Sequence, residues 1–93
     1  MVIGILQIDL FMSENQSLKE KRMILKSLKT RLHNTFNVAV SELEYHDKWQ
    51  RTLIGVASIG NERKAIDRML TKVVDFIDRD RSVEILDYST ELL

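Results

Sequence analysis

Hydrophobic and polar residues alternate along the chain in patterns that predict four β-strands. Residues 2–12 are rich in Ile, Leu and Val and precede the polar segment 13–16, which favours a strand over an amphipathic helix. Residues 37–45 place successive side chains on opposite sides, as a half-buried strand does. Residues 52–59 predict a third strand after a polar turn, and residues 83–90 predict a fourth.

Two longer segments show the spacing of amphipathic helices. The first follows Ser17 and Glu20, which have the spacing of a capping box, and continues to residue 36. The second follows Asn61, which we expect to cap it, and ends before the polar residues 80–82. Apolar positions recur on one side of each helix: Leu18, Ile24, Leu25, Leu28, Leu32 and Phe36 in the first, and Ile66, Met69, Leu70, Val73, Phe76 and Ile77 in the second.

The element order β-α-β-β-α-β predicts an α+β fold of the ferredoxin-like kind, in which two helices cover one face of a four-stranded antiparallel sheet. A chain of 93 residues suffices for one domain, which we expect to span residues 1–93. In this topology the first helix begins at the end of the sheet where the second strand turns into the third. Residues 17–22 and 44–51 are therefore predicted to be neighbours in space.

Charge is distributed unevenly along this chain, whose formal net charge is zero. Residues 17–36 contain six Lys or Arg residues and one Glu, a local charge of +5 that the rest of the chain offsets. At about 100° per residue, one stripe of the first helix contains Lys19, Arg22, Lys26, Lys29 and His33. Such a stripe suits a nucleic acid backbone, but many helices carry a one-sign stripe that is only solvated.

The turn before the third strand adds the only tryptophan of the chain to this basic set. Trp49 is flanked by Lys48 and Arg51 and offers a ring on which an unpaired base can stack, although tryptophans in such positions also close the edge of a core. The start of the helix at Ser17 is rich in backbone donors and offers an anion site. The candidate nucleic-acid contacts are Lys19, Arg22, Lys26, Lys29, Lys48, Trp49 and Arg51.

Lys21 differs from the other basic residues because it projects from the apolar side of its helix. A lysine in that position either snorkels toward solvent at the helix end or is held by a carboxylate. Glu42 belongs to the core-facing set of the second strand, near the same end of the predicted sheet. We therefore predict a structural ion pair between Lys21 and Glu42.

The face of the sheet away from the helices is predicted to be apolar. We expect it to carry Ile3, Ile5, Phe11, Ala39, Leu43, Tyr45, Leu86 and Tyr88. A patch of this size exceeds what monomers usually leave exposed, so pairing with a second copy in a two-fold homodimer is the expected cover. A dimer of this kind that enclosed a pocket would alternatively bind a small regulatory ligand.

The titratable residues at the end of the sheet where residues 17–22 and 44–51 are predicted to meet form no recognisable catalytic constellation. We therefore expect no enzymatic activity. The titratable candidates there are Lys21, Arg22, Glu42, His46 and Asp47. The chain has no Cys, two His without metal-motif spacing and three scattered Gly, so we expect no catalytic residue, metal or cofactor. The N-terminal apolar segment suits neither a secretory signal nor a membrane span, which favours a cytoplasmic protein without a membrane partner.

Several short motifs together resemble the YlxP-like proteins, a small bacterial family of unassigned function, and the resemblance extends over nearly the whole chain. The motifs are Leu18-Lys19-Glu20-Lys21-Arg22, Phe36-Asn37-Val38, Glu42 and Trp49-Gln50-Arg51. This sequence departs from the family by having Ala39-Val40-Ser41-Glu42 where Ser-Val-Ala-Glu is frequent, so we assign no role to a hydroxyl there. The resemblance implies a ferredoxin-like fold and a link to translation. We therefore prefer RNA or ribosome contact, with a homodimeric interaction or small-ligand module as the alternative.

Overall fold

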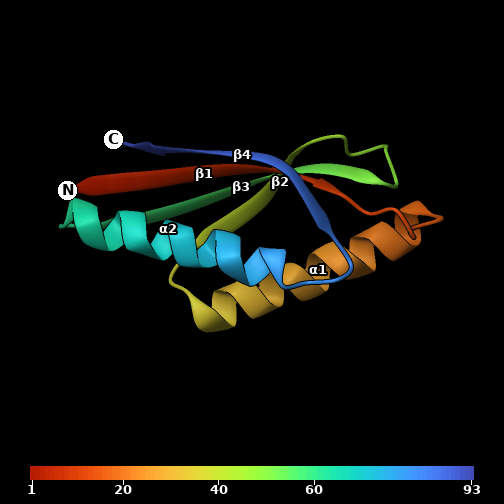
Figure 1. The fold of residues 1–93 in the computed structure, drawn as a ribbon, viewed down its shortest axis with the longest axis horizontal. Helices are drawn as coiled ribbons and strands as arrows, with labels where there is room; N and C mark the ends of the chain where they lie inside the picture. The colour runs from red at the N-terminus through yellow and green to blue at the C-terminus, as the bar shows by residue number, and fades with distance from the viewer.

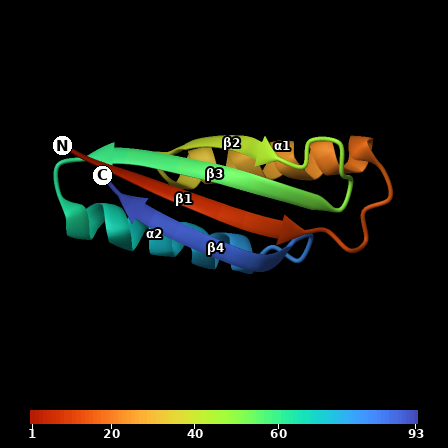
Figure 2. The same cartoon turned by 90° about the horizontal axis from the view of Figure 1, so that it is seen from above.

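The computed structural model describes residues 1–93 and has both helices on one face of a four-stranded sheet (Figure 1). The elements are β1 (Val2–Phe11), α1 (Leu18–Thr35), β2 (Ala39–Glu44), β3 (Arg51–Gly60), α2 (Arg63–Asp78) and β4 (Glu84–Leu92). The strand order is β2-β3-β1-β4, and all neighbouring strands are antiparallel. The predicted ferredoxin-like α+β fold is confirmed. Figure 2 shows α1 behind β2 and α2 behind β4, so each helix runs beneath one edge of the sheet.

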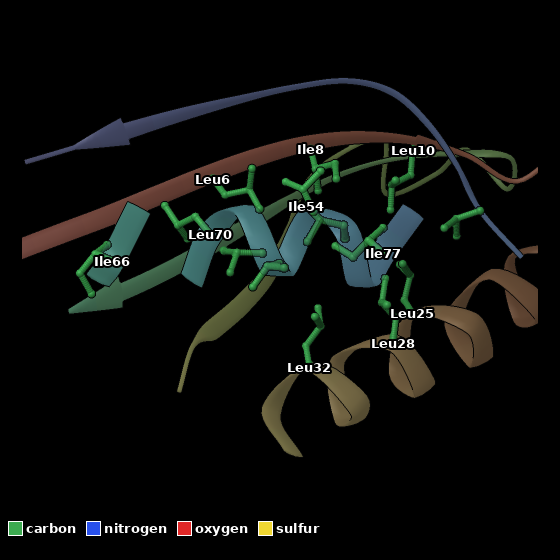
Figure 3. Packing of buried hydrophobic residues seen from close by; sticks show 14 of the residues in the cluster. Leu6, Ile8, Leu10, Leu25, Leu28, Leu32, Ile54, Ile66, Leu70 and Ile77 are labelled. Carbon is green, nitrogen blue, oxygen red and sulfur yellow. The ribbon is translucent and has the colours of Figure 1, made fainter. Parts of the chain in front are cut away.

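The core lies between the sheet and the two helices because β1 alternates strictly between its two faces. Its even-numbered residues from Val2 to Leu10 face the helices and are buried, whereas its odd-numbered residues are at least partly exposed. Leu6, Ile8 and Leu10 meet side chains from both helices and from β3 in one cluster (Figure 3). β1 pairs with β3 on one side and β4 on the other, so its buried residues lie in the middle of the core.

The two helix starts differ in how they are capped. Ser17 Oγ accepts a hydrogen bond from the backbone N–H of Glu20 at 3.1 Å, as the capping box predicts. The Glu20 carboxylate accepts from the N–H of Gln16 at 3.0 Å, one residue earlier than in the standard motif. The predicted cap at Asn61 is wrong, because Glu62 occupies the N-cap position of α2 and makes no side-chain capping bond.

A β-bulge in β4 changes which residues reach the helix-free face of the sheet. The pairing register shifts between Asp9 and Leu10, and Leu86 is the residue left without a partner. Tyr88 lies opposite Ile8, whose side chain is buried beneath the helices. Because directly opposed residues share a face, Tyr88 is on the helix side of this edge strand. Its predicted place on the helix-free face is therefore wrong.

Candidate nucleic-acid interface

Two loops meet at one end of the sheet, which we call the convergent end: the loop between β1 and α1, and the turn between β2 and β3. The N–H of Met12 donates to the carbonyl of Gln50 at 2.9 Å, and Asn15 Nδ2 donates to the carbonyl of Trp49 at 2.9 Å. Gln50 Nε2 donates in the other direction to the carbonyls of Ser13 and Asn15, at 3.0 and 3.1 Å. These reciprocal bonds hold the backbone around Trp49 in place.

Lys21, in the first turn of α1, also holds the turn between β2 and β3 in place. The residue is only 1% exposed, and its ammonium donates to the carbonyls of Tyr45 and Lys48 at 2.5 Å each. Its Nζ also lies 2.8 Å from Glu42 Oε2, so the structure brings Lys21 and Glu42 together as the sequence analysis predicts. Tyr45 has a φ of 67°, a left-handed conformation that bulky residues rarely adopt. The bonds to its carbonyl from Lys21 and from the N–H of Lys48 stabilise that conformation.

Glu42 remains ionised in this partly buried position. Burial by itself raises the pKa of its carboxyl group, but hydrogen bonds from Lys21 and Thr52 and the charges of Lys21 and His46 outweigh it, so the pKa lies below the ordinary value of 4.5. Thr52 Oγ1 donates to Glu42 Oε2 at 2.6 Å. The carboxylate therefore compensates the buried ammonium and leaves little net charge inside the convergent end.

The basic stripe of α1 faces an open groove between this helix and the edge strand β2. This basic groove has a volume of about 390 Å³ and is lined by Arg22, Leu25, Lys26, Lys29, Thr30, His33 and Glu42. The ion pairs of the chain are Lys21–Glu42, Arg31–Asp80 and Arg51–Asp9. None of the basic side chains that line the groove is therefore paired with a carboxylate. Lys19 is exposed on the first turn of α1 and does not line the groove.

Trp49 and Lys48 are both exposed beside the convergent end. The Trp49 side chain is not enclosed by the core, since the residue is 51% exposed, whereas its carbonyl is held by Asn15. The Trp49 ring is therefore presented to solvent from a backbone that is held in place.

The anion site expected at the start of α1, at Ser17, is already used, because the Glu20 carboxylate occupies the start of the helix.

Arg51 does not join the basic stripe. It is paired with Phe11 on the helix-free face, and its guanidinium makes two bonds to the Asp9 carboxylate, Nε to Oδ1 at 2.8 Å and Nη2 to Oδ2 at 2.7 Å. The same guanidinium lies 4.9 Å from the centre of the Tyr45 ring. The hydrogen bond from Arg51 lowers the pKa of Asp9. Sequence reasoning missed this pair, although alternation in β1 and β3 places both residues on one face.

The helix-free face contains an apolar depression of about 290 Å³, lined by Ile5, Ala39, Val40, Ser41, Leu43, Gly55, Val56 and Ala57. The Leu43 side chain lies over Gly55, where a β-carbon would come within 2.8 Å of it. Ile3 lines a second depression on the same face together with Ile59. Phe11 and Tyr45 lie toward the convergent end, partly buried, beside the Arg51–Asp9 pair, so the apolar part of this face is centred on the two depressions.

Some features associated with other functions are absent. Neither helix has the combination of length and apolar composition that crossing a bilayer requires. No group of three or more His, Asp or Glu side chains has the geometry to hold a metal ion. His33 and His46 are both exposed.

Fold and surface together define a small ferredoxin-like domain that has a basic groove along one helix and an apolar open sheet face. The family model described as "Protein of unknown function (DUF503)" matches residues 3–90. The "Uncharacterized protein YlxP" of Bacillus subtilis (strain 168) is 40% identical over 83 residues, which cover 89% of this chain and 90% of that protein. The chain belongs to this family of unknown function, and the predicted resemblance to YlxP-like proteins is confirmed.

Proposed function

We propose that the protein binds RNA, alone or within the ribosome, through the basic groove. The observation that carries this proposal is the row formed by Arg22, Lys26, Lys29 and His33, which have no carboxylate partner in an ion pair. Along a helix these positions span roughly 16 Å, a length suited to several consecutive phosphates.

Trp49 extends the proposed site toward unpaired bases. Its backbone is immobilised by Asn15 and by the Lys21 bond to the neighbouring carbonyl of Lys48, while the indole is exposed. A preorganised aromatic ring gains stacking energy with little loss of conformational freedom, and only an unpaired base presents its face. The proposal therefore favours single-stranded RNA over a duplex.

A salt titration of binding to total RNA tests the proposal. We expect Lys26→Gln combined with Lys29→Gln to weaken binding on all sequences and to lower the slope of log K against log salt by roughly 1.5 to 2. Lys64→Gln combined with Lys72→Gln, on the exposed side of α2, is the matched control and should leave the slope unchanged. No binding even at low salt would exclude RNA as the partner.

Trp49→Ala separates stacking from charge. We expect it to cost about 1 to 3 kcal/mol on single-stranded RNA and little on duplex RNA. If Trp49→Ala lowers the melting temperature and leaves RNA affinity unchanged, the ring contributes to folding and not to binding.

The apolar depressions on the helix-free face favour a second candidate function, a homodimeric interaction module. Exposed Leu43 and Ile59 lie on this face, and the depressions are lined mainly by aliphatic side chains. A second copy would remove this surface from water. The oligomeric state of the wild-type protein distinguishes this role from a monomeric RNA-binding domain.

A further inference from the structure

The outer edge of β2 is open and lies between two surfaces of different chemistry. β2 is the last strand on its side of the sheet, so its outward backbone N–H and C=O groups have no strand partner. On the helix side of this edge is the basic groove, with Lys26 and Lys29. On the other side is the apolar depression, with Ala39 and Leu43. Figure 2 shows β2 at the border of the sheet with α1 behind it.

A fifth strand added at the β2 edge would contact both the basic groove and the apolar face. Successive side chains of a strand point to opposite faces, so every second residue would lie above the basic groove and the others beside the apolar depression. Acidic side chains would complement the unpaired Arg22, Lys26 and Lys29, and aliphatic ones would pack beside Leu43. We propose that the β2 edge binds an extended segment of another protein in which acidic and aliphatic residues alternate, by addition of a strand to the sheet.

A second copy of this chain fits the edge less well. Its own β2 carries one acidic residue on the helix side, Glu42, which is already paired with Lys21. A shift in register after Glu42 places Glu44 opposite Leu53 on the helix-free face. Two-fold pairing of the β2 edges would also bring the basic helices α1 of the two copies toward each other, each from a segment of charge +5. The repulsion between them opposes this dimer, whereas an acidic peptide removes the same positive potential.

This interaction goes beyond RNA binding and would exclude it at the groove. A bound acidic segment places carboxylates where the phosphates of RNA would lie, so the two ligands compete for Lys26 and Lys29. Only the peptide would form hydrogen bonds with the β2 backbone. Protection of the β2 amides from hydrogen exchange therefore distinguishes peptide binding from RNA binding in the groove.

The test uses the full chain and a capped octapeptide that alternates Glu and Val, carrying a fluorescent label for anisotropy. We expect saturable binding, and slowed hydrogen exchange of the outward-facing amides of residues 39–44 with no change in β4. Lys26→Glu combined with Lys29→Glu should weaken binding at least tenfold, whereas Lys64→Glu combined with Lys72→Glu on α2 should not. The same peptide with Lys in place of Glu should not bind.

Four outcomes would overturn the inference. These are binding without protection of residues 39–44, protection of β4 instead, equal affinity for the Lys-containing peptide, and protection of the β2 amides in the free protein with a dimeric mass by light scattering. The last outcome would assign the edge to a second copy. Absence of peptide binding would overturn the inference as well, and binding of total RNA in that case would leave the proposed RNA contact intact.

Discussion

At the scale of single residues, Lys21 makes the contacts that join the most separate parts of the chain. Its ammonium connects the first turn of α1 to Glu42 on β2 and to two carbonyls of the following turn. A lysine this deeply buried requires full compensation, because an unpaired charge in the interior costs several kcal/mol. Here a carboxylate and two carbonyl oxygens provide it, and the exposed segment around Trp49 gains a fixed position.

Removal of the ammonium should therefore be costly. We expect Lys21→Met to lower the free energy of unfolding by roughly 3 kcal/mol or more, because Glu42 then remains partly buried without its partner. The double variant Lys21→Met with Glu42→Leu should recover much of this loss, since it removes both charges together. Urea denaturation of the two variants and the wild type measures both effects. Equal stability of Lys21→Met and the wild type would contradict the structural role of the pair.

The lowered pKa of Glu42 predicts how this pair responds to acid. A carboxyl group with a lower pKa in the folded state than its ordinary value of 4.5 stabilises the fold fully above that pH, and the contribution is lost as the pH falls through the folded-state pKa. We expect the stability difference between the wild type and Glu42→Gln to be constant near pH 7 and to shrink below about pH 4.5. Urea denaturation from pH 7 to pH 3 measures it. A difference that does not change with pH would contradict the prediction.

At the scale of elements, the two helices are specified in different ways. α1 has a side-chain cap at Ser17 and a carboxylate at its first turn, whereas α2 begins without a side-chain cap. α2 compensates with its apolar side, of which Ile66, Leu70 and Val73 are buried against the sheet. Packing of an amphipathic side contributes more to helix stability in proteins than the terminal bonds do, so α2 forms without a cap.

A pair of alanine substitutions tests this difference. Ser17→Ala should reduce stability by about 1 kcal/mol, because it removes the acceptor for the N–H of Glu20. Asn61→Ala is the matched control and should change stability by less than about 0.5 kcal/mol, since Asn61 makes no capping bond. Thermal unfolding followed by circular dichroism compares the two. A loss at Asn61 as large as at Ser17 would show that Asn61 caps α2 in solution.

At the scale of the whole molecule, charge and apolar surface are segregated. The basic side chains of α1 that have no ion-pair partner lie on the helix side of the β2 edge, and the aliphatic residues lie on the open face of the sheet. The remaining chain is acidic in sum, which explains a net charge of zero despite a strongly basic segment. The molecule therefore has a basic surface and an apolar surface on the two sides of one sheet edge.

Assembly through the open face is predicted to depend on Leu43. Leu43 is 44% exposed beside the apolar depression, so Leu43→Asp should convert a dimer into monomers or aggregates. The wild-type interface is expected to bury about 1,200 Å² or more in total, the lower limit for stable association. Tyr88→Asp is the matched control, because Tyr88 is exposed to a similar extent, 52%, but lies on the helix side of β4. Light scattering gives the mass, and a monomeric wild type would reject this interface.

The amino-acid sequence by itself determined the six elements, their order and the capping of α1, because these depend on local periodicity and on short-range hydrogen bonds. It also determined that Lys21 and Glu42 would meet, since the crossover topology brings the start of α1 to the end of β2. The helical spacing of the basic residues likewise placed Arg22, Lys26, Lys29 and His33 on one side of α1.

Only the tertiary structure decided the contacts that depend on register and loop conformation. The bulge in β4 moved Tyr88 to the helix side, because one unpaired residue reverses the alternation that follows it. The pairs Arg51–Asp9 and Arg31–Asp80 join residues 42 and 49 positions apart. Alternation places Arg51 and Asp9 on one face, but their contact depends on the register between β1 and β3. The groove beside β2 likewise arises only when α1 packs against the sheet, because residues of α1 and Glu42 of β2 line it together. The left-handed conformation of Tyr45 is held by a bond to its carbonyl from Lys21 of α1.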